Sequence, residues 1–546
     1  MKMRILFYIA VFIFSISSLQ AQKNSTRPSI QGPPGYKVNS YSGNLYYERQ
    51  DFLIESIGPK LNFQFAYNSS KRTMNRGYGY GWTFNFNILH YEEDGFTIVE
   101  KSDGKKIKFS PVNGSFQAEK GVFDKLREYE SGKLELRMKD GTRYLFEDSQ
   151  HKRVTQILDR CDNALMLSYT DSLVTTITDA VGRAINLNWA NGRLIEIKHD
   201  LVDSTRTYQY SYDAEGNLTR YTNPLGYTQE YTYDASHKLI RVIDENSTPT
   251  KVSYHASGGV KGISSCDQSF TISYNPRANR TYLVETIGEE RHVTTYQFDE
   301  DGRISEKQGN CCGYNTKYAY DDNNNISKKI DGNDNEQLLT YDDMGNISSN
   351  TDPFGKLEKF IYDPIFNKVL SKTDRLGNTT TYEYDSKGNL TKTAYPLNIV
   401  EQWTYNDKGK LLAYTDPRNN TTKHKYDEFG YLIQKIYADS TSKKFTYDKT
   451  GNRLTSTDGN GNTTQFKYDH LNRVSEIIDP LGNSIKHIYD PIGNLIELID
   501  ANGGSTQMEY DGLGQLIAET SPMGKTFSYK YNARGDVIET LSLIHI

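Results

Sequence analysis

The sequence predicts an all-β protein, a spiralling array of antiparallel β-hairpins preceded by a separate β-rich N-terminal domain. A Tyr-Asp or Tyr-Asn step recurs every 21 or 22 residues through the C-terminal half of the chain. Around each step, large and polar side chains alternate with a period of two, which is typical of strands. The chain is polar overall, with a mean hydropathy of −0.71, yet contains 42 tyrosines. This combination favours a thin, extended β surface over a compact globule.

The first 21 residues have the three parts of a secretory signal. Lys2 and Arg4 precede an apolar run from Ile5 to Ile16, and small residues lead to Ala21. The run is shorter than the ~20 residues that a membrane-spanning helix needs. We therefore predict that residues 1–21 are removed, and that the mature chain is secreted or lies at the cell surface without a transmembrane anchor.

Three further segments follow. Residues 22–35 contain Pro28, Pro33 and Pro34 and are interpreted as a linker. Residues 36–150 alternate like strands but lack the 21-residue period, which indicates a β-rich domain of its own. The repeats are expected to run from residue 155 to residue 540.

The tyrosines of the repeated step define the array. They are Tyr320, Tyr341, Tyr362, Tyr384, Tyr405, Tyr426, Tyr447, Tyr468, Tyr489, Tyr510 and Tyr531. Upstream, Phe298, Tyr212 and Tyr233 keep the same spacing, and Tyr169, Trp189, Tyr254 and Tyr274 resemble degenerate members. Internal repetition of this kind indicates one supersecondary unit stacked many times.

Each unit is predicted to be strand, turn, strand, turn. In residues 379–385, Tyr382 and Tyr384 share one face of the strand. The turn that follows has a glycine suited to a left-handed conformation. This glycine recurs as Gly388, Gly409, Gly430, Gly451, Gly493 and Gly514. The second turn, as in residues 479–482, has the Asp-Pro-x-Gly pattern of a type I turn.

One hairpin is marginally stable alone, so successive hairpins are expected to pair into one sheet. The shared parity of the tyrosines predicts that they lie on a common face. Because flat sheets of many strands are unusual, the sheet is expected to curl. If a shell closes, we expect the tyrosine face to point inward.

These repeats, such as residues 384–390 (Tyr-Asp-Ser-Lys-Gly-Asn-Leu) and 489–495, resemble the Rhs/YD-repeat family, which is related to teneurins and to the C component of insecticidal toxin complexes. Residues 42–46, 65–69 and 79–82 are similar to the domain that often precedes such repeats. The resemblance implies a β shell around a C-terminal passenger, commonly a toxin, with autoproteolysis near the end of the shell. The nearest match to the family's cleavage motif, residues 479–483, is an ordinary repeat turn, so autoproteolysis is assigned to no residue.

The sequence contains no HExxH, GxSxG or Walker motif, and we predict no catalytic residue, no metal site and no cofactor. His424 and His487 take a position that aromatic rings hold in other repeats. The acidic stretches 321–325 and 331–335 lack the pattern of a calcium loop and are interpreted as Asx turns. A net charge of −5 gives no indication of a nucleic-acid partner. Pairing among the cysteines is left open; they are Cys161, Cys266, Cys311 and Cys312.

The leading hypothesis is a non-enzymatic scaffold, part of an Rhs-type shell whose partner is a C-terminal passenger absent from this chain. The alternative is a cell-surface adhesion or carbohydrate-binding repeat protein, whose partner is a surface carbohydrate or protein. Residues 541–546 (Leu-Ser-Leu-Ile-His-Ile) place an apolar run where every earlier unit has a polar turn. Since this hexapeptide is also what a transposon-based sequencing adapter encodes, we expect it to be an artefact and the natural chain to continue.

Overall fold

The computed structural model of the chain describes residues 29–148, 150–200, 205–266, 268–310, 315–532 and 535–543. The predicted signal segment lies outside these residues, as do Cys311, Cys312 and residues 544–546. The described residues form β-strands and three short 3-10 helices, η1 (Ser69–Lys71), η2 (Pro276–Ala278) and η3 (Pro396–Asn398). The predicted all-β fold class is confirmed. No helix among the described residues is long and apolar enough to cross a membrane.

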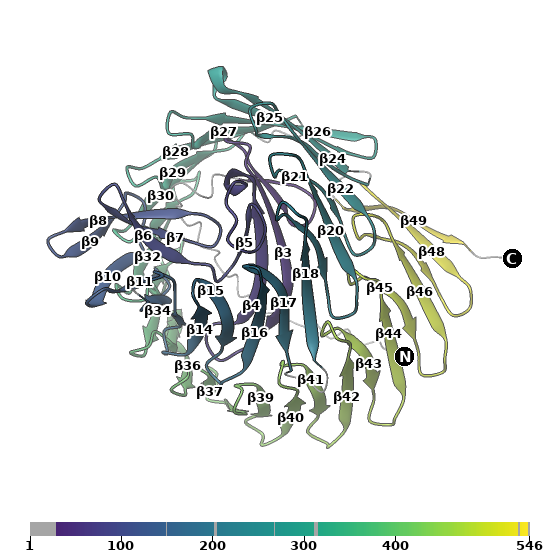
Figure 1. The fold of residues 1–546 in the computed structure, drawn as a ribbon. Helices are drawn as coiled ribbons and strands as arrows, with labels where there is room; N and C mark the ends of the chain where they lie inside the picture. Colours follow the sequence, from purple (N-terminus) through teal and green to yellow (C-terminus); the bar gives the residue numbers. More distant parts are fainter. Residues whose placement is uncertain are drawn as a thin grey trace.

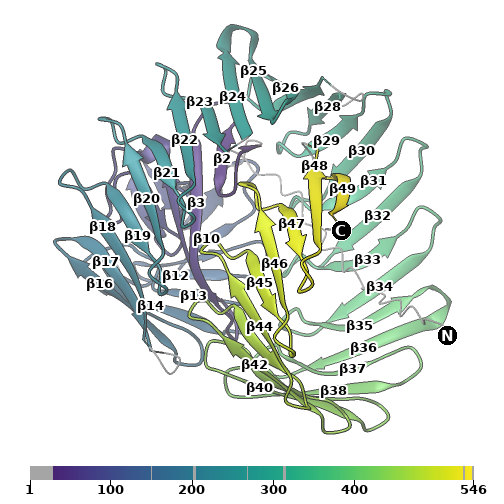
Figure 2. The same cartoon turned by 90° about the vertical axis from the view of Figure 1, so that its right-hand side faces the viewer.

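Forty strands form one antiparallel sheet, in which each strand pairs with the next one along the chain. Because twist accumulates from strand to strand, the sheet curls into a spiral, seen from two directions in Figures 1 and 2. We call residues 125–265 the first winding and residues 315–543 the second winding; residues 268–309 join them.

The first winding contains β10 (Lys125–Glu130), β11 (Lys133–Arg137), β12 (Arg143–Phe146), β13 (Gln156–Leu158), β14 (Ala164–Thr170), β15 (Leu173–Thr178), β16 (Ala184–Ala190), β17 (Arg193–His199), β18 (Arg206–Tyr212), β19 (Leu218–Thr222), β20 (Thr228–Tyr233), β21 (Leu239–Ile243), β22 (Pro249–Tyr254) and β23 (Val260–Ser265). The joining strands are β24 (Gln268–Asn275), β25 (Arg280–Ile287), β26 (Glu290–Phe298) and β27 (Ile304–Gly309).

The second winding contains β28 (Asn315–Tyr320), β29 (Ile326–Ile330), β30 (Glu336–Tyr341), β31 (Ile347–Thr351), β32 (Leu357–Tyr362), β33 (Val369–Thr373), β34 (Thr379–Tyr384), β35 (Leu390–Tyr395), β36 (Ile399–Tyr405), β37 (Leu411–Thr415), β38 (Thr421–Tyr426), β39 (Leu432–Ile436), β40 (Ser442–Tyr447), β41 (Arg453–Thr457), β42 (Thr463–Tyr468), β43 (Val474–Ile478), β44 (Ser484–Tyr489), β45 (Leu495–Ile499), β46 (Ser505–Tyr510), β47 (Leu516–Thr520), β48 (Thr526–Tyr531) and β49 (Val537–Leu543). Leu541 pairs with Ser528, so β49 includes the first three residues of the predicted artefact.

Two kinds of turn alternate along the sheet. The turn after a motif tyrosine, here called the tyrosine turn, is exemplified by residues 385–389: the Gly388 N–H donates to the Asp385 carbonyl at 3.0 Å. The other, here called the return turn, is exemplified by residues 479–483, where the Gly482 N–H donates to the Asp479 carbonyl at 3.0 Å. Turns of one kind lie along one rim of the sheet, because the strands are antiparallel and sequential.

The motif tyrosine sits at a β-bulge. Tyr384 pairs with Leu390 while Glu383 pairs with Lys392, which leaves Thr391 as an extra residue. The same register shift recurs at the other tyrosine hairpins of the second winding. Because a bulge bends its strand and increases local twist, its repetition accounts for the regular curvature of the sheet.

The N-terminal residues form two small sheets. The first consists of β1 (Ser29–Gln31), β2 (Tyr36–Asn39), β3 (Leu45–Ile54), β4 (Leu61–Asn68) and β5 (Trp82–Phe84) in sequential order. The second consists of β6 (Leu89–Glu93), β7 (Phe96–Glu100), β8 (Lys106–Val112) and β9 (Ser115–Ala118). In Figure 1, β3 lies within the curve of the large sheet, beside β18.

The structure differs from the predicted segment boundaries in three places. Strand β1 lies inside the segment interpreted as a linker, because Ser29–Gln31 pairs with β2. Strands β10–β12 belong to the large sheet, although residues 125–146 were assigned to the N-terminal domain. Strands β10–β12 pair with the rest of the large sheet although they lack the Tyr-Asp step. The 21-residue period therefore places the start of this sheet too far along the chain. The N-terminal sheet is also not separate in its packing, because one hydrophobic core joins β1–β5 to β10–β27.

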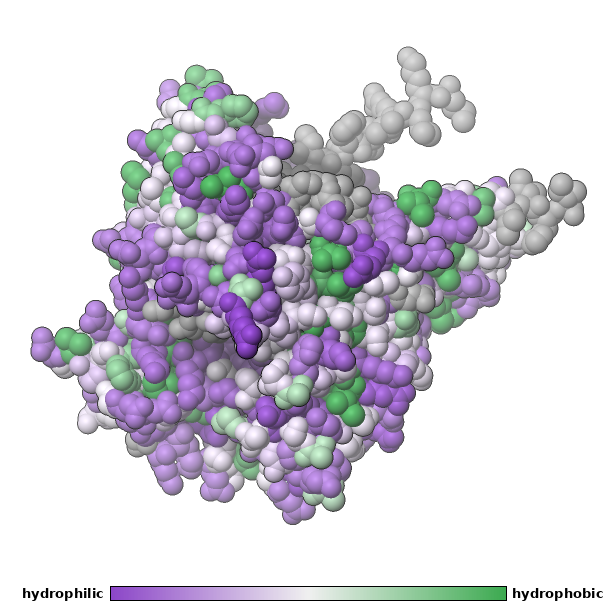
Figure 3. Space-filling model, turned by 90° about the horizontal axis from the view of Figure 1, so that it is seen from above, coloured by the Kyte–Doolittle hydropathy of each residue, from purple (hydrophilic) through white to green (hydrophobic). Residues whose placement is uncertain are grey.

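The outer surface agrees with the low hydropathy of the chain. Seen from above in Figure 3, it is mostly hydrophilic, with hydrophobic residues in scattered groups. The buried hydrophobic residues gather instead where the N-terminal sheet meets the first winding and the joining strands.

Candidate functional site at the inner face of the sheet

Every predicted motif tyrosine of the second winding is the last residue of a strand and is half-buried. The Tyr384 hydroxyl donates to the carbonyl of Val369, the first residue of the preceding strand, at 2.8 Å. This carbonyl lies beyond the last backbone pair of β33 with β34, so the hydroxyl takes the place of a ladder N–H. Equivalent bonds are made by Tyr320, Tyr341, Tyr426, Tyr468, Tyr489, Tyr510 and Tyr531.

The same bond identifies the degenerate repeats. The hydroxyls of Tyr169, Tyr254 and Tyr274 donate to carbonyls 14 or 15 residues upstream. Trp189 does so through its indole Nε1–H, which lies 2.7 Å from the Val174 carbonyl. Burial raises the pKa of Tyr169, Tyr254, Tyr274 and Tyr384, that of Tyr384 to about 12. They therefore stay protonated donors at neutral pH.

The predicted turn glycines all have positive φ, from 74° at Gly388 to 109° at Gly493. In the repeat of Tyr468, Asn472 takes this place with a φ of 63°. Asparagine tolerates the left-handed region, which explains the gap in the glycine series. Gly388 also lies against the first winding, because a Cβ there would be 2.8 Å from the Arg160 guanidinium. Some glycines thus serve both turn geometry and close packing.

The turn aspartates make Asx turns, as predicted for the two acidic stretches. Asp321 accepts from the N–H groups of Asn323 and Asn325 at 2.8 Å, and Asp331 accepts from those of Asn333 and Asn335 at 2.9 Å. Hydrogen bonds to the Asn335 amide and backbone lower the pKa of Asp331. The carboxylates therefore organise their own loops.

The N-terminal sheet covers the tyrosine face of the first winding. The Trp82 indole N–H donates to the Tyr233 hydroxyl at 2.6 Å, and the ring of Phe52 stacks on that of Tyr208 at 4.5 Å. Because the sheet is continuous, these contacts define the tyrosine face as the inner face of the spiral.

Arg49 is the buried centre of this contact. Its guanidinium donates to Asp51 and to the Tyr231 hydroxyl, both at 2.6 Å, and lies 4.0 Å from the centroid of the Tyr221 ring. Tyr210 donates its hydroxyl hydrogen to the same carboxylate. Burial raises the pKa of Asp51, while the adjacent Arg49 opposes this effect. The cost of burying these two charges is therefore offset by their attraction to each other and by their hydrogen bonds with Tyr231 and Tyr210.

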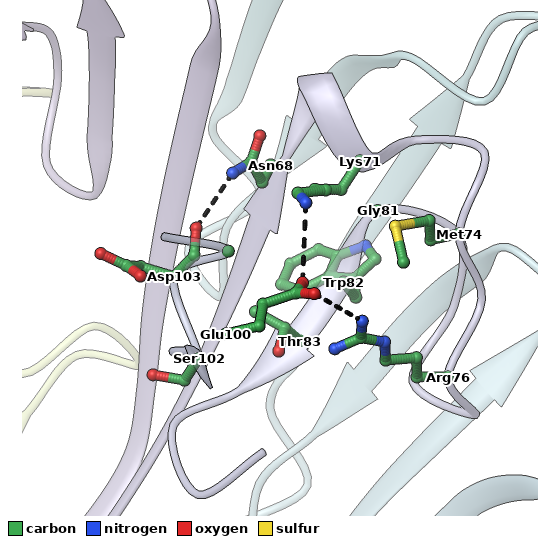
Figure 4. A pocket seen from close by; sticks show the side chains of 11 residues that line it. Asn68, Lys71, Met74, Arg76, Gly81, Trp82, Thr83, Glu100, Ser102 and Asp103 are labelled. Atoms are coloured by element: carbon green, nitrogen blue, oxygen red, sulfur yellow. Dashed lines mark hydrogen bonds and ion pairs between the residues drawn. The ribbon is translucent and has the colours of Figure 1, made fainter. Parts of the chain in front are cut away.

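A small hollow beside Trp82 is closed by ion pairs (Figure 4). The buried Glu100 carboxylate lies 3.1 Å from the Arg76 guanidinium and 3.6 Å from the Lys71 ammonium. The hollow encloses about 20 Å³, room for about one water. It ties the loop after β4 to the β7–β8 turn and is too small for a metabolite.

At the start of the second winding Tyr318 packs against the core and Leu339 is buried, but from residue 357 onward its inner face bears no such covering among the described residues. A row of half-buried side chains, two residues before each motif tyrosine from Tyr362 onward, lines this part of the face: Phe360, Tyr382, Trp403, His424, Phe445, Phe466, His487, Met508 and Tyr529. As expected, the two histidines replace rings here, with His487 stacked on Tyr489 at 6.4 Å. Burial, together with Lys435, lowers the pKa of His424.

One constellation on this face was missed in the sequence. The Tyr395 and Tyr414 hydroxyls donate to the Glu401 carboxylate at 2.8 and 2.6 Å, and the Trp403 ring lies 5.5 Å from that of Tyr414. Register alone brings these residues together, since Trp403 pairs with Tyr414 across β36 and β37. The sequence does mark this hairpin as unusual, because its return turn at Pro396 departs from the usual Asp-x-x-Gly pattern.

No group of three or more His, Cys, Asp or Glu side chains with metal-binding geometry occurs in the described part of the chain. Cys161 is buried between the two windings, near the Asn389 side chain. The described inner face offers hydrogen-bonding and aromatic surface.

Three family models match the chain. The model described as Teneurin YD-shell matches residues 266–434, 358–492 and 415–542, slightly more than half of the chain in total. The RHS Repeat model matches residues 189–228 and 212–249, and a domain of unknown function matches residues 35–109.

Curated relatives carry nuclease names. The tRNA nuclease WapA of Bacillus subtilis (strain 168) is 29% identical over 316 residues, which are 56% of this chain and 13% of that protein. The probable deoxyribonuclease RhsB of Dickeya dadantii (strain 3937) is 23% identical over 53% of this chain and 18% of that protein. The chain thus matches less than a fifth of the length of these relatives.

Solved structures share the fold. The Photorhabdus luminescens Tc holotoxin pore with mutation TccC3-D651A has a TM-score of 0.50 at 11% identity, covering 89% of this chain and 30% of that chain. The complex titled TcdB2-TccC3 without hypervariable C-terminal region has a TM-score of 0.51, also at 11% identity, covering 89% and 31%.

Proposed function

The chain belongs to the teneurin YD-shell family, and from this premise we propose that it is a non-enzymatic wall segment of a β shell that encloses a passenger polypeptide. The observation that carries the proposal is the difference between the two windings. The inner face of the first winding is buried under the N-terminal sheet, whereas that of the second is lined by half-buried rings. An aromatic, concave face of this kind suits an enclosed chain.

The chemistry of the inner face of the second winding suits a polypeptide better than one small ligand. Rings such as Phe466 and Trp403 provide apolar contact, and Lys435, Lys443 and Glu401 provide dispersed charges of both signs. The nuclease names of the relatives point to a toxic enzyme as the class of passenger, and the predicted N-terminal signal supports export. The activity then resides in the passenger, and the shell isolates it.

A matched pair of thiol probes tests the enclosure. Phe466→Cys points inward, and Lys467→Cys, its neighbour on the same strand, points outward. In the complete gene product purified from its producing organism, we expect maleimide to label the outer thiol about tenfold faster or more, because the passenger shields the inner one. In the 546-residue chain alone, the two rates should converge. Equal labelling in the complete gene product contradicts the proposal.

A second function is favoured by the constellation around Glu401. A carboxylate held by two tyrosines beside Trp403 resembles a carbohydrate-binding platform, in which rings stack on the sugar and the acid accepts its hydroxyls. Binding of the chain to an immobilised glycan panel, lost in Trp403→Ala and retained in Trp82→Phe, would support adhesion. Absence of binding to any glycan favours the shell.

A further inference from the structure

The repeat that ends in Tyr362 holds a cation of its own over an inner ring. The Lys372 ammonium lies 2.8 Å from the Glu358 carboxylate and 5.5 Å from the centroid of the Phe360 ring. The register explains this group, because Lys372 pairs with Phe360 across β32 and β33, and Glu358 precedes Phe360 by two residues on the same face. One acid and one ring therefore hold an ammonium group here, through its charge and through the face of the ring.

The repeat that ends in Tyr405 keeps the acid and the ring but replaces the lysine. Glu401 and Trp403 stand four and two residues before the motif tyrosine, in the places of the acid and the ring. Tyr414 stands in the place of the lysine, because it pairs with Trp403 across β36 and β37. Within the described residues Glu401 forms no ion pair, and the two hydrogen bonds to its carboxylate come from neutral phenols. This repeat thus offers a cation site without an internal cation.

An unusual return turn adds a further wall to this site. Residues 396–398 form a return turn of three residues, whereas the preceding return turn, residues 374–378, has five. The shorter turn adds one backbone pair to the hairpin, and through this pair Tyr395 comes to lie diagonally opposite Glu401. The turn holds Leu397 at a φ of 67°, which is unfavourable for a side chain of this size. Strained backbone of this kind is found preferentially at ligand sites.

The walls of the site are aromatic and open to the interior of the spiral. The Trp403 and Tyr414 rings lie 5.5 Å apart, and Tyr395 is 40% exposed. An ammonium group has three donors for the remaining lone pairs of the carboxylate, and the carbon chain behind it can lie along a ring. A neutral sugar would stack on the same rings but would leave the carboxylate charge uncompensated. The group formed by Tyr395, Glu401, Trp403 and Tyr414 is called the Glu401 site below.

We propose that the Glu401 site binds the primary ammonium group of an alkylamine, which takes the place that Lys372 holds in the earlier repeat. The amine is either a lysine side chain of a polypeptide or a small free amine, since both present the same chemistry. The inference goes beyond the shell proposal, because the site needs no enclosed chain. It differs from the carbohydrate hypothesis in the charge of the ligand.

Saturation-transfer NMR on the purified 546-residue chain tests the need for charge. Pentylammonium is the probe, and pentan-1-ol, which has the same carbon chain, is its neutral match. We expect saturation transfer to pentylammonium to exceed that to pentan-1-ol about fivefold or more, because only the cation gains from the carboxylate and the ring faces. N-acetyl-lysine methylamide separates the two sources. Tighter binding than pentylammonium indicates a lysine of a polypeptide, and weaker binding indicates a free amine.

Two variants locate the binding. Glu401→Gln removes the charge but keeps the shape, and it should weaken pentylammonium binding about tenfold. Tyr414→Lys supplies the internal cation of the earlier repeat and should also abolish binding, because its own ammonium fills the site. Phe466→Leu is the control: it changes an inner ring whose cross-strand partner is Ile477, and it should leave the affinity unchanged. Far-UV circular dichroism checks that each variant keeps its β-sheet, and each of the two site variants suffices if the other does not fold.

Four results would overturn the proposal. Equal saturation transfer to pentylammonium and pentan-1-ol shows that charge is not recognised. An affinity that is unchanged in a folded Glu401→Gln or Tyr414→Lys variant places the cation elsewhere. Equal weakening by Phe466→Leu and Glu401→Gln shows a general association with the inner face. Binding of methyl β-glucoside that is lost in Trp403→Ala, without binding of pentylammonium, assigns the site to carbohydrate.

Discussion

At the scale of single residues, the buried charges decide how the N-terminal sheet is held. The Arg49 and Asp51 side chains are 4% and 0% exposed, and both are satisfied only by each other and by tyrosines of the first winding. A buried pair contributes little net stability when intact but is costly to break.

We therefore expect Arg49→Met to lower the free energy of unfolding by about 3–5 kcal/mol, because it leaves the Asp51 charge uncompensated. The double variant Arg49→Met/Asp51→Leu should recover part of this loss. Urea unfolding followed by tryptophan fluorescence measures both. A double variant that is less stable than Arg49→Met would show that packing, rather than charge, dominates at this position.

His199 makes the same contact sensitive to pH. It is 2% exposed between the rings of Phe52 and Tyr208, and burial, reinforced by Arg206, lowers its pKa to about 4. The unfolded chain, with a pKa near ~6.5, then binds the proton more tightly than the folded chain. The stability associated with neutral His199 is thus complete above pH ~6.5 and is lost as the pH falls from there toward 4.

Between pH 7 and pH 5 this amounts to about 2 kcal/mol. We expect His199→Phe to show a smaller drop in Tm over this interval than the wild type, measured by scanning calorimetry. The comparison with the wild type cancels other titrating groups, including Asp51. Identical drops in the two proteins would assign the acid sensitivity elsewhere.

At the scale of the hairpin, the tyrosine hydroxyl joins each unit to the one before it. The bond from Tyr254 to the Leu239 carbonyl and the bond from Tyr468 to the Arg453 carbonyl are both 2.9 Å long. They differ in surroundings, since Tyr254 packs against the core while the Tyr468 bond is exposed. Water can replace the hydroxyl only at the exposed site.

Tyr254→Phe is therefore expected to cost about 1–3 kcal/mol, the penalty for a buried carbonyl without a donor, and Tyr468→Phe about 0.5–1 kcal/mol. Chemical denaturation of the two variants, which differ from the wild type by one oxygen each, provides the measurement. If Tyr468→Phe were the more destabilising, the bond would have to act through sheet curvature rather than through satisfaction of the carbonyl.

At the scale of the whole molecule, the contact between windings fixes the pitch of the spiral. A Cβ at Gly409 would lie 3.7 Å from the Cβ of Cys161, although the two residues are far apart in sequence. This is within the ~3.5–4.5 Å that a disulfide requires.

Gly409→Cys should thus form a disulfide with Cys161 under mild oxidation, visible as a linked pair of peptides by mass spectrometry without reduction. Gly430→Cys, in the next tyrosine turn but facing Ile57, is the control and should give no link to Cys161. Linkage of Cys161 in the control at a similar yield would mean that the windings slide past one another.

The sequence by itself determined the local structure. The 21-residue spacing of the tyrosines, their parity and the Gly and Asp positions correctly predicted hairpins, Asx turns and one antiparallel sheet, because each depends on contacts within one or two units. Trp189 could be recognised as a repeat member for the same reason.

Tertiary structure decided everything that depends on neighbours one winding apart. The place of the N-terminal sheet against the first winding and the pairing of Arg160 with Gly388 leave no period in the sequence. The physical reason is that these contacts are set by the accumulated twist of many strands. A small change of twist per strand would bring different turns together, whereas the hairpins themselves would be unchanged.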